Sequence, residues 1–168
     1  MELLVIRHAI AEDRDAFAKT RKPDAARPLT DEGRKKMRKV ARGLREIVPA
    51  ITVLASSPLI RARETADIVA RAYGDVEVTT TPTLAPDQPP KGVAAWLEGR
   101  RADGTVAVVG HEPALSQLVG WLVSGEARSV IDLKKGAACL LDLPPGAAAA
   151  TATLLWALTP AQLRALGD

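Results

Sequence analysis

The sequence predicts a three-layer α/β/α sandwich around a mostly parallel central sheet. Residues 3–6 and 106–109 are unbroken runs of Val, Ile, Leu and Ala, a composition typical of strands buried on both faces of a parallel sheet. Segments whose apolar residues recur at helical spacing alternate with such runs, as expected when helices cover both faces. The 168 residues, 47% of them hydrophobic, fit a single domain spanning residues 1–168 with one large core.

Six apolar or β-branched runs are expected to form the strands. They span residues 3–6, 51–55, 76–81, 106–109, 137–143 and 152–158. The last two are joined through Pro144, Pro145 and Gly146, which predicts a hairpin of neighbouring strands and hence an antiparallel edge to the sheet. For the parallel pairs, helices between strands predict right-handed crossovers.

Five segments with a periodic apolar face are expected to form helices. They span residues 30–48, 58–74, 91–100, 112–125 and 160–166. Thr30 is the expected N-cap of the first of these helices, Pro58 stands at a favoured first helical position, and Gly125 is a natural stop. A turn is expected at residues 103–104. The polar segment 9–28 is expected to be a long functional loop with a short helical turn, and the proline-rich segment 81–90 a stiff loop.

The sequence also predicts where the protein is located and the state of its cysteine. Glu2 stands at the start of the first strand and leaves no room for a basic leader, and no apolar stretch approaches the length of a membrane span. A cytoplasmic protein without membrane association is therefore expected. The lone Cys139 lies in an apolar run, which predicts a buried, unreactive thiol and no intramolecular disulfide.

The basic residues are concentrated in one segment. The net charge is +3, and seven of the 23 Lys and Arg residues lie within residues 34–45. Apolar residues recur there at helical spacing, so the cations are expected on the solvated face of an amphipathic helix. Aromatic residues make up only 3% of the chain and none is interleaved with these cations, which argues against nucleic-acid binding. Attraction to an acidic partner protein stays open.

Each of the two histidines in the chain directly follows the end of an expected strand. His8 follows Arg7 and His111 follows Gly110, and Arg61 lies in the first turn of the helix expected from Pro58. Ligands of parallel sheets bind at the carboxyl ends of the strands. Arginine and helix N-termini both favour a dianion, and nearby cations favour a neutral, nucleophilic imidazole. The arrangement predicts a phosphate site.

Four motifs resemble the histidine phosphatase, or phosphoglycerate mutase-like, superfamily over nearly the whole chain. They are Arg7-His8-Ala9, Arg27-Pro28-Leu29-Thr30 followed by Gly33, Ser57-Pro58-Leu59-Ile60-Arg61-Ala62 with Thr65, and Gly110-His111-Glu112-Pro113. The resemblance implies that His8 is a nucleophile that becomes phosphorylated. It also implies that Arg7, Arg61 and His111 bind the phosphoryl group, with no metal and no cofactor. Ser57 is a candidate substrate-binding residue, and Arg27 is either another or half of a surface ion pair.

One departure from the family pattern points to the substrate. Many members carry a general acid as a Glu two residues after a Leu, where this chain has Leu84-Ala85-Pro86. Without that acid an alcohol leaves poorly, whereas the nitrogen of phosphohistidine is a better leaving group. The chain thus resembles the SixA-type phosphohistidine phosphatases, and the expected partner is a phosphohistidine-bearing protein such as a phosphotransfer domain. Four carboxylates could replace the acid or be solvated loop residues: Asp87, Glu12, Asp13 and Glu112.

Three alternatives stay open. The first is a phosphatase of small phosphomonoesters such as a sugar phosphate or nucleotide. The second is a non-catalytic phosphate-binding module, which the intact nucleophile and cationic set disfavour. The third is a metallohydrolase using His8, His111, Glu12 and Asp13, which the neighbouring Arg7 disfavours because it would repel a divalent cation. The sequence slightly favours a monomer and does not identify the phosphoprotein.

Overall fold

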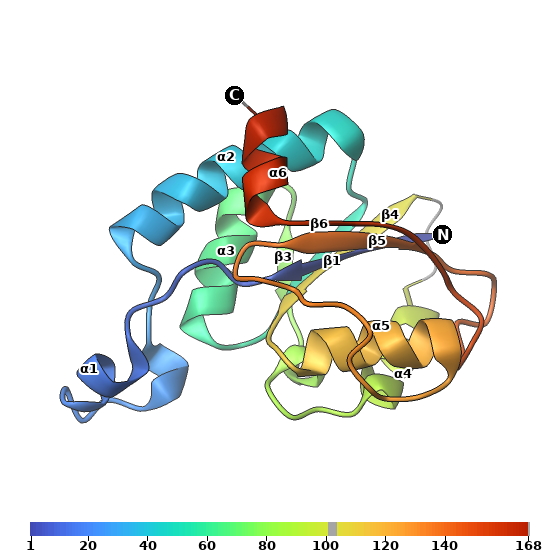
Figure 1. Cartoon of the computed structure of the whole chain (residues 1–168), viewed down its shortest axis with the longest axis horizontal. Helices are drawn as coiled ribbons and strands as arrows, with labels where there is room; N and C mark the ends of the chain where they lie inside the picture. Colours follow the sequence, from blue (N-terminus) through green and yellow to red (C-terminus); the bar gives the residue numbers. More distant parts are fainter. Residues whose placement is uncertain (101–103, 168) are drawn as a thin grey trace.

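The computed structural model describes residues 1–100 and 104–167, in which a mixed six-stranded sheet lies between helices (Figure 1). The strands are β1 (Glu2–Arg7), β2 (Val53–Ser56), β3 (Val78–Thr80), β4 (Thr105–Gly110), β5 (Ala138–Asp142) and β6 (Thr153–Leu158). Their order in the sheet is β3-β2-β4-β1-β5-β6. The pairings β1 with β4, β2 with β4 and β2 with β3 are parallel, whereas β5 is antiparallel to β1 and to β6. The expected sheet and its antiparallel hairpin edge are confirmed.

Helices cover both faces of this sheet (Figure 1). They are α1 (Arg14–Ala18), α2 (Asp31–Ile47), α3 (Ile60–Ala72), α4 (Pro90–Glu98), α5 (Ala114–Ser124) and α6 (Pro160–Leu166), with 3-10 turns η1 (Asp24–Ala26) and η2 (Pro82–Leu84). Apolar residues of α2, α3 and α6 form one core cluster with the sheet, and those of α4 and α5 form a second. The three-layer sandwich is therefore confirmed.

The two central strands have the burial that their sequences predict. Residues 3–6 and 106–109 are completely buried. Side chains of a strand alternate between its faces, so Leu4 and Ile6 join the cluster under α2 and α3, while Leu3 and Val5 join the cluster under α4 and α5. Apolar side chains at every position therefore serve two cores, which explains why these runs are unbroken.

Helix boundaries agree with the local signals at most ends. The Thr30 side chain accepts a hydrogen bond from the backbone N–H of Gly33 and caps α2, and Gly125 ends α5 with a left-handed φ of 84°. The prediction that a helix begins at Pro58 is wrong by two residues. The Ser57 hydroxyl accepts a hydrogen bond from the Leu59 N–H and keeps the chain extended there, so α3 begins at Ile60. The helix expected from residue 112 also begins later, at Ala114, directly after Pro113.

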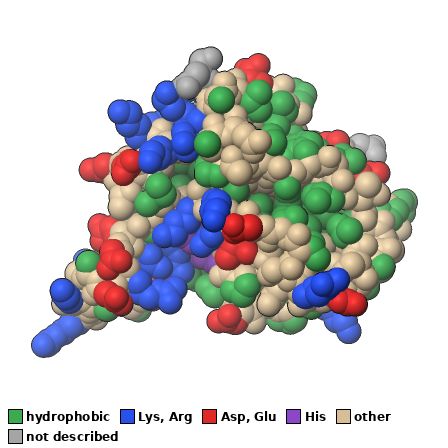
Figure 2. All heavy atoms as spheres, in the orientation of Figure 1, with side chains coloured by type: hydrophobic (Ala, Val, Ile, Leu, Met, Phe, Trp, Pro, Cys, Tyr) green, Lys and Arg blue, Asp and Glu red, His purple; other side chains and the backbone are tan. Residues whose placement is uncertain are grey.

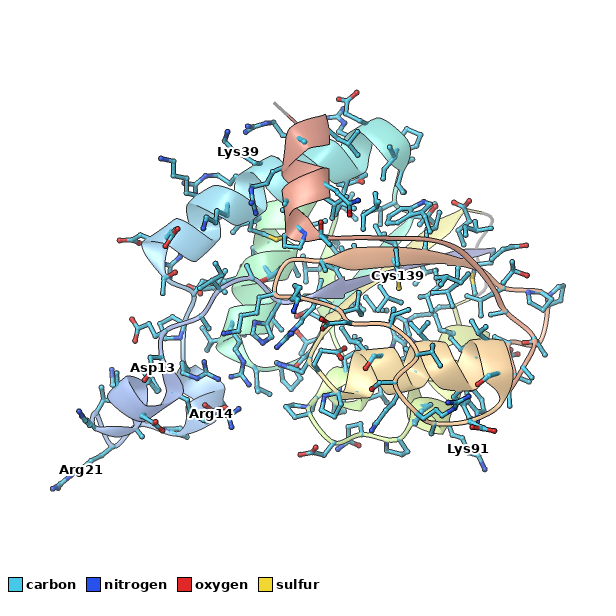
Figure 3. All side chains as sticks on the ribbon, viewed as in Figure 1. Asp13, Arg14, Arg21, Lys39, Lys91 and Cys139 are labelled. Carbon is cyan, nitrogen blue, oxygen red and sulfur yellow. The ribbon has the colours of Figure 1, made fainter. Side chains whose placement is uncertain are left out.

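The segment 9–28 forms an excursion beside the body of the molecule (Figure 1). It contains α1 and η1, two short helical turns where the sequence predicted one. Its base is closed by hydrogen bonds from the Glu12 N–H to the Pro28 carbonyl (2.9 Å) and from the Thr30 N–H to the Ile10 carbonyl (3.0 Å). Arg21 points outward at the tip of this excursion (Figure 3).

Four other expectations concern single features of the chain. Helix α2 is amphipathic, with Met37 and Val40 buried and the charged side chains of Lys35 and Arg38 exposed. Cys139 is buried in β5 (Figure 3), and burial raises the pKa of its thiol to about 12, as fits an unreactive cysteine. Of the turn expected at residues 103–104, the first residue lies outside the described residues. No described helix combines the length and apolar character needed to cross a membrane.

Candidate active site

Three neighbouring parallel strands bring the predicted residues to one edge of the sheet. Arg7 is the last residue of β1 and pairs in register with Gly110, the last residue of β4, so His8 and His111 emerge side by side. Their ring centroids are 5.1 Å apart with the planes inclined by 55°. Figure 2 shows the histidine colour at the surface only in a small area bordered by Lys and Arg side chains. The site is a buried imidazole pair beneath a cationic rim.

His8 is held as a neutral imidazole with one available nitrogen. Its Nδ1 lies 2.7 Å from the carbonyl oxygen of Ala9, which fixes the proton on Nδ1 and leaves the lone pair on Nε2. The His8 side chain is buried, and this burial lowers its pKa to about 3, with smaller contributions from Arg61 and Arg7. The sequence argument attributed the lowering of the pKa to the cations alone, whereas desolvation is the larger cause.

His111 is oriented by Ser57. The Ser57 hydroxyl oxygen lies 2.8 Å from Nε2 of His111 and accepts a hydrogen bond from the Leu59 N–H, and its own hydrogen can be donated to Nε2. In this arrangement Nδ1 of His111 carries the ring proton, and no described residue accepts it although Nδ1 is buried. Burial, followed by the charges of His8 and Arg61, lowers the pKa of His111 to about 3.

Arg7 and Arg61 are each held by a hydrogen bond to a backbone carbonyl. Nη1 of Arg7 donates to the carbonyl oxygen of Leu133 (2.7 Å), and Nη1 of Arg61 donates to the carbonyl oxygen of Asp24 (3.1 Å). The Asp24 carboxylate adds an ion pair to the same Arg61 nitrogen at 3.2 Å. In both guanidinium groups Nε is buried and has no hydrogen-bond partner among the described residues. Each arginine is thus anchored at one end and keeps a buried donor unused.

Arg27 lies at the edge of this set, and its buried side chain forms an ion pair with the half-exposed Asp24 carboxylate. Its Nε donates to the Asp24 carboxylate (2.8 Å) and its Nη1 to the Glu12 carbonyl (2.8 Å). Asp24 therefore joins Arg27 to Arg61. Sequence reasoning missed Asp24, although its position three residues before Arg27, at a spacing that allows a local ion pair, could have drawn attention to it.

Helix α3 supports the backbone around the nucleophile. The Thr65 hydroxyl accepts from the Ala9 N–H (3.0 Å) and donates to the Arg61 carbonyl (2.7 Å), which ties the residue after His8 to the first turn of α3. Glu64 accepts from the Leu29 N–H (2.6 Å) and from Arg34 (2.8 Å), and this holds the segment after Arg27 in place. Glu64 was not singled out from the sequence.

The four carboxylates considered as general acids lie in different surroundings. Asp87 lines a cavity of about 360 Å³ that also contacts Arg61. The Asp13 carboxylate instead caps α1, and the Glu112 carboxylate accepts two hydrogen bonds from Ser116. The Glu12 side chain is exposed. Of the four, the structure therefore brings Asp87 to the cavity beside Arg61.

The metal-site alternative needed His8, His111, Glu12 and Asp13 to converge. Within residues 1–100 and 104–167, no group of three His, Cys, Asp or Glu side chains is placed to hold a metal ion. That ligand set is therefore not assembled.

Comparison with known proteins gives a consistent result. Residues 3–85 match the model of the histidine phosphatase superfamily (branch 1). An uncharacterised protein of Picosynechococcus is 35% identical over 150 residues, which cover 88% of this chain and 87% of that protein. Phosphohistidine phosphatase SixA of Escherichia coli is 28% identical over 171 residues, covering 98% and 97%. The structure of the protein histidine phosphatase SixA complexed with tungstate matches with a TM-score of 0.82 and 25% identity, over 97% and 99% of the two chains.

The sheet and its covering helices therefore have a known counterpart. The architecture is the phosphoglycerate mutase-like fold. The chain belongs to the histidine phosphatase superfamily, whose members are phosphatases and mutases, and it is similar in sequence and structure to SixA.

Proposed function

We propose that this protein is a phosphatase that acts through a phosphohistidine intermediate on His8 and removes phosphoryl groups from phosphohistidine in proteins. One observation carries the proposal. Nε of Arg7, Nε of Arg61 and Nδ1 of His111 are buried and have no hydrogen-bond partner among the described residues. Buried donors without partners are rare because they are destabilising. A phosphoryl group beside His8 would supply oxygen acceptors to all three.

The reaction follows from the protonation states of the two histidines. Nε2 of neutral His8 attacks phosphorus in line, a new N–P bond forms, and the P–N bond of the substrate breaks. The substrate imidazole leaves with its electron pair and the proton it already carries. Arg7, Arg61 and the Nδ1–H of His111 stabilise the charge on the equatorial oxygens. Water then attacks the phosphorus of phospho-His8, which releases inorganic phosphate and restores neutral His8.

Two guanidinium groups supply the positive charge that a divalent metal supplies in many phosphoryl-transfer enzymes. A guanidinium is a permanent cation in proteins, so the proposed site needs no bound metal and no cofactor to bind a dianion. The proposed enzyme is therefore metal-independent.

The segment after β3 favours a phosphohistidine substrate. Leu84 is buried in η2, and Ala85 and Pro86 follow it, so the family's usual general acid is replaced by an apolar stretch. An alkoxide leaving group needs a proton donor, whereas the imidazole of phosphohistidine can be protonated before the P–N bond breaks. We therefore propose a phosphohistidine-bearing protein, such as a phosphotransfer domain, as the substrate.

The test is capture of the intermediate. The protein is mixed with a phosphotransfer domain that carries ³²P-phosphohistidine, in the presence of EDTA, and quenched in alkali. We expect acid-labile, alkali-stable label on the wild type and none on His8→Ala, with turnover of the variant lower by at least about 10³-fold. EDTA-sensitive turnover without label would overturn the mechanism. Equal turnover by wild type and His8→Ala would show that His8 is not the nucleophile, and no turnover by the wild type would favour a binding module.

A phosphomonoesterase is the second candidate, and Asp87 is the observation that favours it. Asp87 and Arg61 line the same cavity. In the ester reaction, the Asp87 carboxyl would protonate the alkoxide leaving group. The comparison of kcat/KM on phosphohistidine protein and on a panel of sugar phosphates and nucleotides decides between the two. If esters are cleaved faster and Asp87→Asn removes that activity alone, the substrate is an ester.

A further inference from the structure

A second cavity lies beside the nucleophile and outside the phosphoryl site. It has a volume of about 200 Å³ between α2, α6 and the chain that follows β1. Its floor includes the apolar residues Met37, Val40 and Pro160, and the ionisable described residues that line it are all cations: Lys36, Lys135 and Arg164. An apolar floor within a cationic rim fits an acidic surface that presents an apolar side chain.

The chain connects this cavity directly to the active site. Ala9, the residue after His8, forms part of its wall, and so does Gly136. The N–H of Gly136 lies 3.2 Å from the carbonyl oxygen of Arg7 and 3.1 Å from that of His8. Lys135 is also close enough to His8 to contribute to the lowering of its pKa. A molecule seated in the cavity would therefore lie against the backbone that holds His8.

The charge around this cavity continues across the molecular surface. Figure 2 shows Lys and Arg side chains gathered near the histidine and again over α2. Lys36 is paired with Glu32 at 2.6 Å, and no ion pair within the described residues neutralises Lys135 or Arg164. Such a field attracts acidic surfaces over about 8–10 Å at physiological salt.

We propose that this cavity, with Lys36, Lys135 and Arg164 on its rim, is a docking site for the acidic surface of the phosphoprotein substrate. The inference rests on the proposed function and adds how the protein substrate is recognised. A single-stranded nucleic acid is the less suitable occupant, because its bases need aromatic stacking partners and the floor is aliphatic. A phosphorylated metabolite fills only the phosphoryl site, so this cavity would distinguish protein substrates from small ones.

The test uses Lys36→Glu/Arg164→Glu and two substrates. The first is an acidic phosphotransfer domain phosphorylated with phosphoramidate, and the second is free phosphohistidine. For the domain we expect kcat/KM to fall at least about tenfold, mainly through KM, and to lose most of its dependence on salt. For free phosphohistidine we expect a change within about twofold, because neither residue contacts the phosphoryl site. Lys35→Glu/Arg38→Glu reverses two exposed charges on the same helix that do not line the cavity, so it should lower kcat/KM for the domain much less than the cavity variant does and leave free phosphohistidine unchanged.

The outcomes separate this inference from the proposed function. If the wild type cleaves both substrates and the cavity variant behaves like its control, docking at the cavity is overturned and the function stands. If both substrates lose activity equally in the cavity variant, the effect is on the catalytic site and docking is again overturned. If an oligonucleotide competes with the phosphorylated domain on the wild type but not on the cavity variant, the occupant is a nucleic acid. If the wild type cleaves neither phosphohistidine substrate, the proposed function itself fails.

Discussion

Asp24 holds Arg61 through two of its own oxygens. The Nη1 atom of Arg61 lies 3.1 Å from the Asp24 backbone carbonyl oxygen and 3.2 Å from its carboxylate. Both contacts are made to the same end of the guanidinium, so its Nε remains buried and unpaired among the described residues. The same carboxylate also receives Arg27 at 2.8 Å. Asp24 thus determines which edge of Arg61 faces the proposed phosphoryl group.

Asp24→Asn should weaken the proposed phosphatase without unfolding the protein. The amide keeps the shape but loses the charge, and a hydrogen bond to a charged group contributes about 1.5–3 kcal/mol, less here because Asp24 is half-exposed. We expect kcat/KM on phosphohistidine protein to fall about fivefold, with only a small decrease in the midpoint of urea unfolding. Asp15→Asn, an exposed residue of α1, is the control. A variant as active as this control would show that Asp24 does not position Arg61.

Ser57→Ala should lower kcat more than it raises KM. In the proposed mechanism the Ser57 hydroxyl donates to Nε2 of His111, so that Nδ1–H faces the phosphoryl oxygens, an interaction that strengthens in the transition state. We expect kcat to fall about tenfold. The ¹⁵N chemical shifts of His111 report the tautomer and should change with the activity.

A matched control for Ser57 stands next to it in the chain. Ser56 is equally buried, but its hydroxyl donates to the Ser57 carbonyl (2.9 Å) and not to His111. Ser56→Ala should therefore leave the His111 tautomer and kcat near their wild-type values. If both variants lose activity to the same extent, the loss reflects packing and not the tautomer.

The sequence predicts the parts of the site that depend on local order. Continuous apolar runs identify strands buried on both faces, and the position of His8 and His111 directly after two such runs places both at one sheet edge. The contacts of Asp24 and Glu64 could not be read in this way. Asp24 meets Arg61 across 37 positions, and Glu64 meets Leu29 across 35 positions, because the excursion folds back on α3. Pairing between distant polar side chains leaves no periodic signal.

The errors in the sequence analysis also have physical causes. The hydroxyl of Ser57 forms a local hydrogen bond to the Leu59 N–H, and this competes with the helical preference of Pro58 and delays α3 to Ile60. The neighbouring arginines suggested the direction in which the pKa of His8 shifts. Desolvation by the packed chain is nevertheless the larger cause, and burial of a side chain at a strand end depends on loops far away in the sequence.

Gly33→Ala should destabilise the fold at the base of the excursion. A Cβ at Gly33 would overlap the carbonyl oxygen of Ile10, which also accepts a hydrogen bond from the Thr30 N–H. Relief of the clash requires movement of that backbone, and overpacking of this kind costs about 1–3 kcal/mol. We expect a lower urea midpoint and weaker activity, because Ile10 lies only two residues after His8.

Gly92→Ala is the matched control for this substitution. In α4 the nearest atom to an added Cβ is 3.6 Å away, on the Thr83 side chain, which is an ordinary contact distance. Alanine is favoured over glycine in a helix by about 0.8–1 kcal/mol, so the free energy of unfolding should stay constant or rise. If both glycine variants lose stability alike, close approach at Ile10 is not the reason that residue 33 is glycine.

The two histidines should make stability depend on pH in a defined direction. Their pKa values fall from the ordinary 6.5 to about 3 in the folded protein. Between these values the unfolded chain binds protons that the folded protein excludes, so the free energy of unfolding increases with pH across this range and levels off above 6.5. Each histidine contributes at most about 1.4 kcal/mol per pH unit.

The measurement is urea unfolding between about pH 4.5 and 7.5, above the ordinary carboxylate range. Asp24 has a lowered pKa, and its contribution is present above its ordinary value of 3.8 and lost below it, so it does not enter this window. His8→Asn/His111→Asn should therefore flatten the rise in the wild-type curve. A slope unchanged by the double substitution would show that other groups titrate there.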